Sequence, residues 1–382
     1  MGMVGGGNDA FIGQVHRIAA AIDGQIELVC GAFSSTKEKS KLSGKQLYLP
    51  DERVYGSYDE MFEKELALPA DVRMEFVSIV TPNHLHYPIA SKALASGFHV
   101  MSDKPATLNL DEILKLREEL NKSGLLYGLT HNYTGYPMVK EAKEMVKTGK
   151  LGKIRKVVVE YPQGWLSTDL ESSGQKQAAW RTDPARSGGC GCMGDIGTHA
   201  ENLMEYITDL QIESICADLN TFVEGRQLDD DGNVLFKLNN GAKGVLHASQ
   251  ISVGEENGLK IYVYGELAGL FWRQLEPNTL QVMWPDRPTE IVRTGANHTN
   301  LSERALYNTR LPAGHPEGFL EAFANIYRNF ASTLQAKLQG REPTELELDF
   351  PQIEDGVRGM AFIDTLIRSQ KCDDKWIKIT EY

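Results

Sequence analysis

The sequence predicts an N-terminal α/β domain with a doubly wound parallel sheet, followed by an α+β domain with a large, mostly antiparallel open sheet. Two observations carry this prediction. Up to about residue 130, short apolar runs alternate with helical patterns, which is the order of strands and crossover helices in a parallel sheet. From residue 214 onward, strand patterns follow one another with turn signals such as Asp231-Gly232 and Asn240-Gly241 between them, as in antiparallel hairpins. We therefore expect domains at residues 1–130 and 131–382.

Composition and charge exclude several classes of protein. Hydrophobic residues make up 41% of the 382 residues and charged residues 24%, the ordinary balance of a folded globular protein. The net charge of -12, without a basic tract, argues against nucleic acid and membranes as partners. The five cysteines are an odd number and suggest no disulfide framework, and we find neither a signal-peptide pattern nor an apolar run near ~18 residues. We expect a cytoplasmic protein.

A glycine-rich turn at residues 5–7 leads into a helical pattern over residues 12–22. Such a turn lets the backbone approach a pyrophosphate, while the helix N-terminus supplies amide donors. Gly5, Gly7 and Gly13 fit the usual dinucleotide-binding fingerprint only with three extra residues before the last glycine. We interpret the turn as a dinucleotide site, and an ordinary turn is the alternative.

The residues after the second predicted strand, 25–33, bear on the type of cofactor. An acidic residue at this strand end binds the ribose hydroxyls of NAD, whereas polar and basic residues accept the extra phosphate of NADP. Ser34, Ser35 and Lys39 follow the strand here, and the first acid is Glu38. The pattern leans towards NADP, although the same residue types are also usual in a solvated turn.

Further strands are predicted at residues 74–80, 98–101 and 125–129, and helices at 58–66, 87–96 and 110–123. Polar residues follow two of these strands, at Thr81–His86 and at Ser102–Pro105. Ligands bind at the carboxyl ends of parallel strands, and the proline after Lys104 keeps that lysine extended. We therefore expect Lys104 to transfer a proton at a ligand, and a solvated surface lysine is the alternative.

Two segments of the second half contain candidate substrate residues. Asp195 and His199 are four residues apart after a glycine-rich stretch, so a helix that starts near Asp195 would place both side chains on one face. A helix cap and a packed histidine are the alternative roles. The long polar segment at 163–183 contains Trp165, Trp180 and Arg181, which could line a sugar-sized pocket or simply pack. Cys190 and Cys192 have no second cysteine pair, so we expect no metal site.

The remaining second half is rich in strands. Its predicted helices span residues 138–148, 317–338 and 353–368, and its strands are expected at residues 154–161, 215–223, 234–238, 242–250, 259–265, 269–273, 280–284 and 290–294. The alternation of side chains along these strands suggests a sheet with two distinct faces. A broad sheet with one uncovered face predicts self-association.

Taken in order, these segments resemble the Gfo/Idh/MocA oxidoreductases, which include glucose-fructose oxidoreductase and inositol dehydrogenases. The matching features are the glycine turn that runs to Gly13-x-x-His16, the TPNxxH segment at Thr81–His86, Lys104-Pro105, and the DxGxH segment at Asp195–His199. Asp103 stands where the family usually has Glu or Cys, a departure that keeps the carboxylate of the Glu form.

The resemblance implies a Rossmann domain that binds NAD(P), followed by a domain whose open sheet forms a homodimer or homotetramer. It also implies that Lys104 transfers the proton, while Asp195 and His199 hold and polarise the substrate hydroxyl. The residues expected at the cofactor are Gly5, Gly7, Phe11, Ile12, Ser34, Ser35, Lys39, Thr81, Pro82, Asn83, His86, Asp103 and Lys104; those expected at the substrate are Lys104, Trp165, Trp180, Arg181, Asp195 and His199.

We expect reversible hydride transfer between nicotinamide and a carbinol carbon of a sugar or cyclic polyol. Lys104 would take the hydroxyl proton, His199 would share or relay it, and Asp195 would orient the substrate or Lys104. Two alternatives are a glycosidase of the same fold that retains its NAD(P), and a sensor that binds the nicotinamide cofactor without catalysis.

Overall fold

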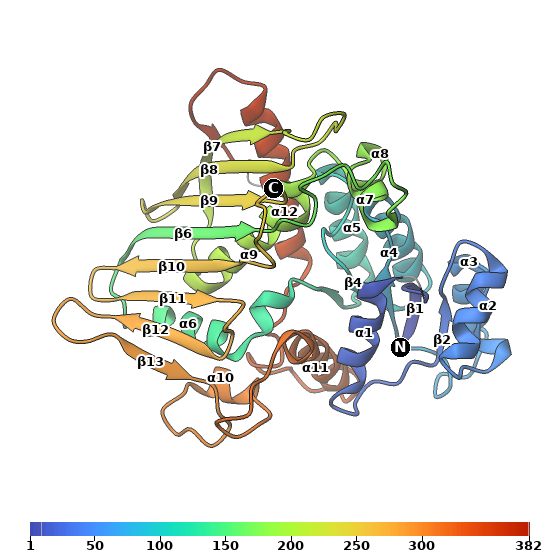
Figure 1. Ribbon diagram of the computed structural model, residues 1–382. Coiled ribbons are helices and arrows are strands. Elements are labelled where there is room, and N and C mark those ends of the chain that lie inside the picture. Colours follow the sequence, from blue (N-terminus) through green and yellow to red (C-terminus); the bar gives the residue numbers. More distant parts are fainter. Residues whose placement is uncertain (9, 381) are drawn as a thin grey trace. The chain divides into compact units, whose positions relative to one another are not determined.

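The computed structural model describes residues 1–8, 10–380 and 382 (Figure 1). The contacts divide the chain into two compact units. Unit 1 comprises Met1–Thr130 with Phe323–Val357, and unit 2 comprises His131–Ala322 with Arg358–Tyr382. Helices α11 (Phe319–Leu338) and α12 (Ile353–Gln370) each begin in one unit and end in the other.

Unit 1 contains a five-stranded parallel sheet in the order β2-β1-β3-β4-β5. This order confirms the predicted doubly wound parallel sheet. The second strand is much shorter than the predicted span of 25–33, because only its last residues pair with β1 at the edge of the sheet. The strands are β1 (Gly2–Gly5), β2 (Cys30–Ala32), β3 (Phe76–Val80), β4 (His99–Ser102) and β5 (Tyr127–Leu129).

The helices of unit 1 begin and end where local signals place them. The Ser57 and Asn109 side chains accept hydrogen bonds from the first turns of α3 and α5, and α5 ends at Gly124 in the left-handed conformation. Helix α11 joins this unit as well, because its Tyr327 hydroxyl lies 2.8 Å from the Ser78 hydroxyl of β3. The other helices are α1 (Phe11–Ala21), α2 (Lys37–Gln46), α3 (Tyr58–Leu66), α4 (His86–Ala95) and α5 (Leu110–Ser123), with short 3₁₀ turns η1 (Asp51–Arg53) and η2 (Asn83–Leu85).

Unit 2 contains a nine-stranded sheet in the order β13-β12-β11-β10-β6-β9-β8-β7-β14. Neighbouring strands are antiparallel except β6 and β9, which confirms the predicted mostly antiparallel sheet. The strands are β6 (Ile154–Pro162), β7 (Ile212–Asn220), β8 (Asp231–Leu238), β9 (Lys243–Ser249), β10 (Lys260–Gly265), β11 (Gly269–Arg273), β12 (Thr279–Met283), β13 (Glu290–Arg293) and β14 (Ile377–Lys378).

One expected turn was wrong. Asp231 and Gly232 lie inside β8 and pair with Asn220 and Leu219 of β7, so the connection between these strands is the loop 221–230. The Asp230 carboxylate draws this loop together, because it accepts hydrogen bonds from the backbone N–H groups of Phe222 and Val223, both at 2.9 Å. The Asn240-Gly241 turn is confirmed, with Gly241 at φ +87°.

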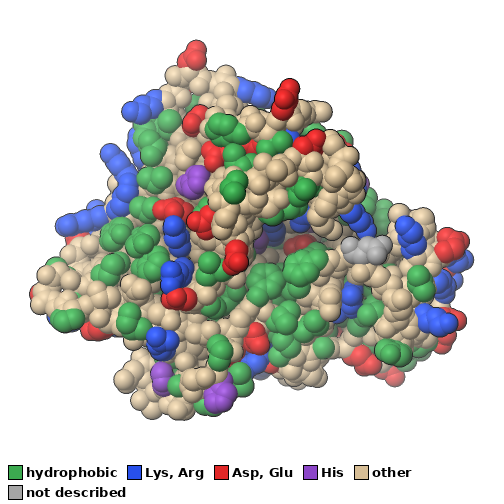
Figure 2. Space-filling view, viewed as in Figure 1, with side chains coloured by type: hydrophobic (Ala, Val, Ile, Leu, Met, Phe, Trp, Pro, Cys, Tyr) green, Lys and Arg blue, Asp and Glu red, His purple; other side chains and the backbone are tan. Residues whose placement is uncertain are grey.

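Helices cover one face of this sheet, and the other face is open. Alternate strand residues such as Val157, Val159 and Leu246 are buried on the side where α6 and α9 pack. The opposite face is turned toward the viewer in Figures 1 and 2, and hydrophobic side chains gather over it among charged ones. The helical segments of unit 2 are η3 (Asn132–Gly135), α6 (Pro137–Lys147), α7 (Lys176–Arg181), α8 (Pro184–Ser187), the π-helix η4 (Met193–Gly197), α9 (Thr198–Thr208) and α10 (Glu303–Tyr307).

Within the described part of the chain, the helices are too short or too polar for any of them to cross a membrane.

Candidate active site

The turn between β1 and α1 has the backbone geometry of a phosphate cradle. Gly5 and Gly6 have φ angles of +80° and +67°, which favour glycine. A Cβ on Gly13 would lie 2.4 Å from the Cα of Gly6, so α1 packs on the turn too closely for any other residue. The first turn of α1 carries no acidic side chain, which leaves its N–H groups suited to an anion. The residues therefore fit the pyrophosphate of a dinucleotide despite the unusual glycine spacing.

Phe11 and Ile12, the other residues expected at this turn, open α1; Phe11 is largely exposed and Ile12 is half-buried. The residues after β2 are open to solvent as well. Ser34 is half-buried, whereas Ser35 and Lys39 are exposed. The only acid on this stretch is Glu38, in the first turn of α2.

The segment after β3 contains both half-buried and fully buried residues. Thr81 and Pro82 are half-buried, whereas Asn83 and His86 are buried. The ring nitrogens of His86 lie 2.7 Å from the Pro105 carbonyl and 2.9 Å from the Thr81 carbonyl. Burial lowers the pKa of His86, against the opposing effect of nearby Asp103. The His86 side chain thus joins the residues that follow β3 to those that follow β4.

Asp103 and Lys104 lie at the carboxyl end of β4. Oδ1 of Asp103 accepts hydrogen bonds from the Lys104 backbone N–H and from the Thr130 hydroxyl, both at 2.9 Å. Nε2 of His16, on α1, lies 3.9 Å from the same oxygen. Lys104 itself is half-buried and precedes a cis proline. The carboxylate of Asp103 therefore fixes the backbone from which the Lys104 side chain extends.

Asp195 does not cap a helix. It lies in the π-helix η4, and α9 begins three residues later at Thr198 without a side-chain cap. Oδ2 of Asp195 accepts hydrogen bonds from Nε2 of Gln250 at 2.8 Å and from Nε of Arg181 at 3.3 Å. The carboxylate is thus held by two side chains, and it is neither fully buried nor fully exposed.

His199 lies in the first turn of α9 and is buried. Its Nδ1 is 3.3 Å from Nδ1 of His131, and its ring meets that of Tyr133 edge-on at 4.8 Å. Burial raises the pKa of the Tyr133 hydroxyl, which hydrogen-bonds with Asn257 at 3.2 Å. The histidine therefore lies beside a second imidazole that can share a hydrogen bond with it and packs against the ring of Tyr133.

The segment after β6 brings its aromatic and basic residues to Asp195. The Arg181 guanidinium lies 4.3 Å from the ring centre of Trp180 and 5.9 Å from that of Trp165. Neither tryptophan is buried. Unit 2 thus brings Arg181 to the Asp195 carboxylate, and the rings of Trp165 and Trp180 lie against the same guanidinium.

Sequence reasoning assigned no role to Gln250, His131, Tyr133 or Asn257. The stretch from His131 to Tyr133 directly follows the last parallel strand, which was a usable signal. Gln250 is the last residue of one predicted strand and Asn257 lies just before the next, and neither belongs to a local motif, so no sequence signal pointed to them. Among the described residues, no group of three or more His, Cys, Asp and Glu side chains is placed to hold a metal ion.

Comparison with known proteins identifies relatives of the whole chain. The family described as "Oxidoreductase family, NAD-binding Rossmann fold" matches residues 1–131, and "GFO/IDH/MocA C-terminal domain" matches residues 139–271. The uncharacterized oxidoreductase YfiI of Bacillus subtilis is 33% identical over 379 residues, which cover 98% of this chain and 95% of that protein.

Solved structures extend the likeness to three dimensions. An inositol dehydrogenase homolog from Azotobacter vinelandii, complexed with NAD+, has a TM-score of 0.93 at 33% identity and covers 99% of this chain and 96% of its own. Its complex with NADH and myo-inositol has a TM-score of 0.90 at 32% identity, with coverage of 99% and 96%. An oxidoreductase from Sinorhizobium meliloti is 44% identical, with a TM-score of 0.88 and coverage of 99% and 98%.

Proposed function

The chain belongs to the Gfo/Idh/MocA family of oxidoreductases, and we propose that it is an NAD(P)-dependent dehydrogenase that acts on a CH–OH group of a cyclic polyol or sugar. The position of Lys104 carries this proposal. The lysine follows β4 in a parallel sheet whose first turn fits a dinucleotide, and Asp103 holds its backbone. A bound nicotinamide would accept the hydride; this chain supplies placement and proton transfer.

Each candidate residue has a distinct task in this proposal. Lys104 takes the hydroxyl proton as the hydride leaves the carbinol carbon. The Asp195 carboxylate accepts a hydrogen bond from a substrate hydroxyl while Gln250 and Arg181 keep it in place. His199 shares that same proton or relays it, since an imidazole both donates and accepts.

A neutral cyclic polyol fits the side chains around Asp195 best. Trp165 and Trp180 offer faces for the C–H surface of a ring, while Arg181 and Asp195 offer a donor and an acceptor for its hydroxyls. The relative complexed with myo-inositol supports this class of substrate. For the cofactor, the serines and lysine after β2 favour NADP, whereas the structures of that relative contain NAD+ and NADH.

We also propose that the open face of the large sheet joins copies of this chain. Paired residues of neighbouring strands form one continuous row across this face, with one residue from each strand between β13 and β7. Every side chain of the row is at least partly exposed. The row is mostly apolar: Ile291, Gln281, Phe271, Tyr262, Val158, Val245, Leu235 and Cys216. A band of this composition is typical of an interface.

The proposed activity is tested by the absorbance of reduced nicotinamide when the protein meets NAD+ or NADP+ with a panel of inositols, aldoses and anhydrosugars. We expect reduction of one cofactor with at least one cyclic polyol. Cofactor binding by calorimetry without any reduction would refute the dehydrogenase. It would favour a glycosidase that retains its cofactor, if glycosides are cleaved, or otherwise a sensor.

A further inference from the structure

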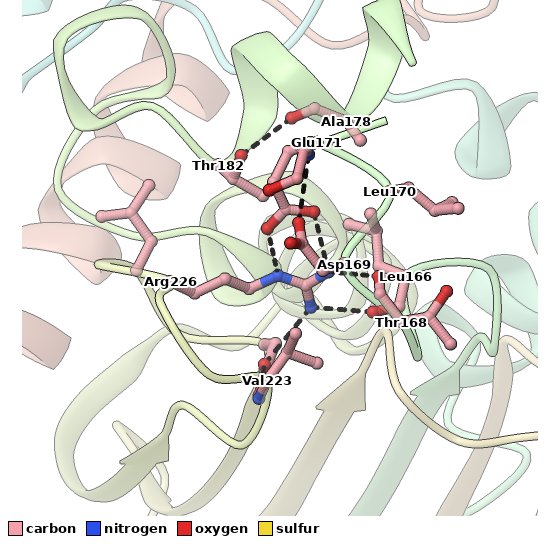
Figure 3. Close-up of polar contacts among 12 residues, drawn as sticks. Leu166, Thr168, Asp169, Leu170, Glu171, Ala178, Thr182, Val223 and Arg226 are labelled. Carbon is pink, nitrogen blue, oxygen red and sulfur yellow. Dashed lines mark hydrogen bonds and ion pairs between the residues drawn. The ribbon is translucent and has the colours of Figure 1, made fainter. Parts of the chain in front are cut away.

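Arg226 lies in the loop between β7 and β8, and its side chain is almost fully buried, with 2% exposed. Its guanidinium binds the segment at residues 166–171, which directly follows Trp165 in the sequence (Figure 3). Nε and Nη2 donate to the two carboxylate oxygens of Glu171, at 2.7 and 3.1 Å. Nη1 and Nη2 also donate to the carbonyls of Leu166 and Thr168, at 2.7 and 2.9 Å. A planar guanidinium is the side chain suited to such a set of acceptors, since its donors are fixed in one plane.

The same guanidinium reaches Asp230 at the far end of its loop. Nη1 donates to Oδ2 of Asp230 at 3.3 Å, and the Asp230 side chain is also 2% exposed. That carboxylate already accepts the backbone N–H groups of Phe222 and Val223. Arg226 therefore ties the segment at residues 166–171 to a loop whose own shape is fixed by buried hydrogen bonds.

Asp229 and Asp230 connect this loop to the surroundings of Asp195 through two separate sets of hydrogen bonds. The Asp230 carbonyl accepts the backbone N–H of Gln250 at 2.9 Å, and the Gln250 side chain binds Asp195 at 2.8 Å. The Asp229 carboxylate accepts the backbone N–H groups of Gly191 and Met193, both at 2.7 Å. These two amides belong to the stretch that leads into the π-helix of Asp195. The loop 226–230 is thus connected to both the Trp165 segment and the Asp195 segment.

We propose that Arg226 is a positioning residue for substrate binding. It keeps the segment at residues 163–175 (the Trp165 segment) and the segment at residues 189–197 (the Asp195 segment) in a fixed arrangement. Arg226 itself contacts neither the carbinol carbon nor its hydroxyl. The proposal rests on the proposed function in one respect: the ligand that these segments bind is taken to be the substrate of the dehydrogenase. Lysine cannot replace Arg226, because one ammonium cannot bind both oxygens of Glu171 and two carbonyls in fixed directions.

The test compares Arg226→Lys with the wild type in steady-state kinetics on the polyol that the substrate panel identifies. We expect kcat/KM to fall by about 10–100-fold, because small displacements of binding groups have effects of this size. Most of the change should appear in KM. The cofactor Kd should stay the same, because the glycine turn belongs to unit 1. Glu171→Gln should change KM in the same direction by a smaller factor.

Arg341→Lys is the matched control, since Arg341 binds the carboxylate of Glu347 with two nitrogens, at 2.8 and 2.7 Å, as Arg226 binds that of Glu171. This pair belongs to unit 1, and its loss should leave KM unchanged. A wild-type KM in both Arg226→Lys and Glu171→Gln would overturn the proposal. A variant in which thermal stability, cofactor affinity and kcat all fall along with the rise in KM would also overturn it, since that pattern shows a general structural role.

Hydrogen exchange gives a readout that does not depend on catalysis. In Arg226→Lys we expect faster exchange in peptides that cover residues 163–175 and also in peptides that cover 189–197. Faster exchange in the first peptides alone would overturn the connection to Asp195. If the wild type reduces no cofactor with any polyol, the proposed function fails, while the exchange experiment still decides the positioning role.

Discussion

Nε2 of His16 lies 3.9 Å from Oδ1 of Asp103, the oxygen that also accepts the backbone N–H of Lys104. The other ring nitrogen of His16 lies 2.7 Å from the Tyr327 hydroxyl, which meets the Ser78 hydroxyl at 2.8 Å. A helix near the start of the chain and a helix near its end therefore support the same carboxylate. This arrangement keeps the backbone of Lys104 fixed while its side chain remains partly exposed.

Lys104→Ala should lower kcat by about 10²–10⁴-fold, the usual contribution of a positioned acid or base. Cofactor affinity should change little, because the glycine turn is untouched. The measurement is steady-state kinetics together with calorimetry of NAD(P) binding. Lys92→Ala is the control, since the Lys92 ammonium is half-exposed on α4 and pairs only loosely with Asp59, at 3.5 Å. An unchanged kcat in Lys104→Ala would remove the lysine from the mechanism.

Gly13→Ala should weaken cofactor binding by about tenfold or more and lower stability by about 1–3 kcal/mol, as overpacking does. Its Cβ would lie 2.4 Å from the Cα of Gly6, so the turn must move away from α1. Calorimetry of cofactor binding and thermal unfolding measure both effects. Gly359→Ala is the matched control: it lies inside α12, and apart from the neighbouring backbone of that helix no atom lies within 4 Å of its Cβ position. That change should be neutral or slightly stabilising.

His99 should make stability depend on pH between about 6.5 and about 4. Burial, followed by the nearby charge of Lys337, lowers the pKa of His99 to about 4. Because the unfolded chain binds the proton more tightly, stability is fully present above pH ~6.5 and is lost as the pH falls towards 4.

The loss should be on the order of 3 kcal/mol over this range, measured as denaturant unfolding at several pH values. His99→Gln keeps an acceptor for the Leu126 backbone N–H, which now donates to Nδ1 of His99 at 2.8 Å. This variant should flatten the pH dependence in that range. The same slope in wild type and His99→Gln would show that other groups cause it.

Ser34→Asp should shift the cofactor preference towards NAD. A carboxylate at the end of β2 suits the ribose hydroxyls of NAD and repels the extra phosphate of NADP. The ratio of kcat/KM for the two cofactors should change by about tenfold or more, since opposed like charges cost several kcal/mol. A ratio that stays at the wild-type value would show that Ser34 does not face the ribose.

Tyr262→Glu should weaken self-association. Tyr262 lies near the centre of the apolar row on the open sheet, in register with Val158 and Phe271, so a buried carboxylate there would be unpaired. Light scattering after size-exclusion chromatography should show a smaller mass for this variant than for wild type. Tyr48→Glu, at a highly exposed tyrosine of unit 1, is the control and should leave the mass unchanged. A monomeric wild type would exclude the proposed interface.

Local patterns determined much of the fold. Hydrophobic residues recur with a period of two in strands and 3.6 in helices, and glycines and polar residues mark the ends of these elements. These patterns suffice to place most helices within a few residues and to predict the two kinds of sheet. They also marked Lys104 and Asp195, because both belong to short motifs at the ends or starts of elements. Such signals can be read from the sequence because they depend on neighbours along the chain.

Only the tertiary structure decided what these motifs touch. Gln250 binds Asp195 across 55 residues of sequence, and His16 meets Tyr327 across 311. The parallel pairing of β6 with β9 and the buried role of Arg226 likewise have no local pattern. The physical reason is that periodicity specifies which face of an element is apolar, whereas the partner of that face depends on how distant elements pack.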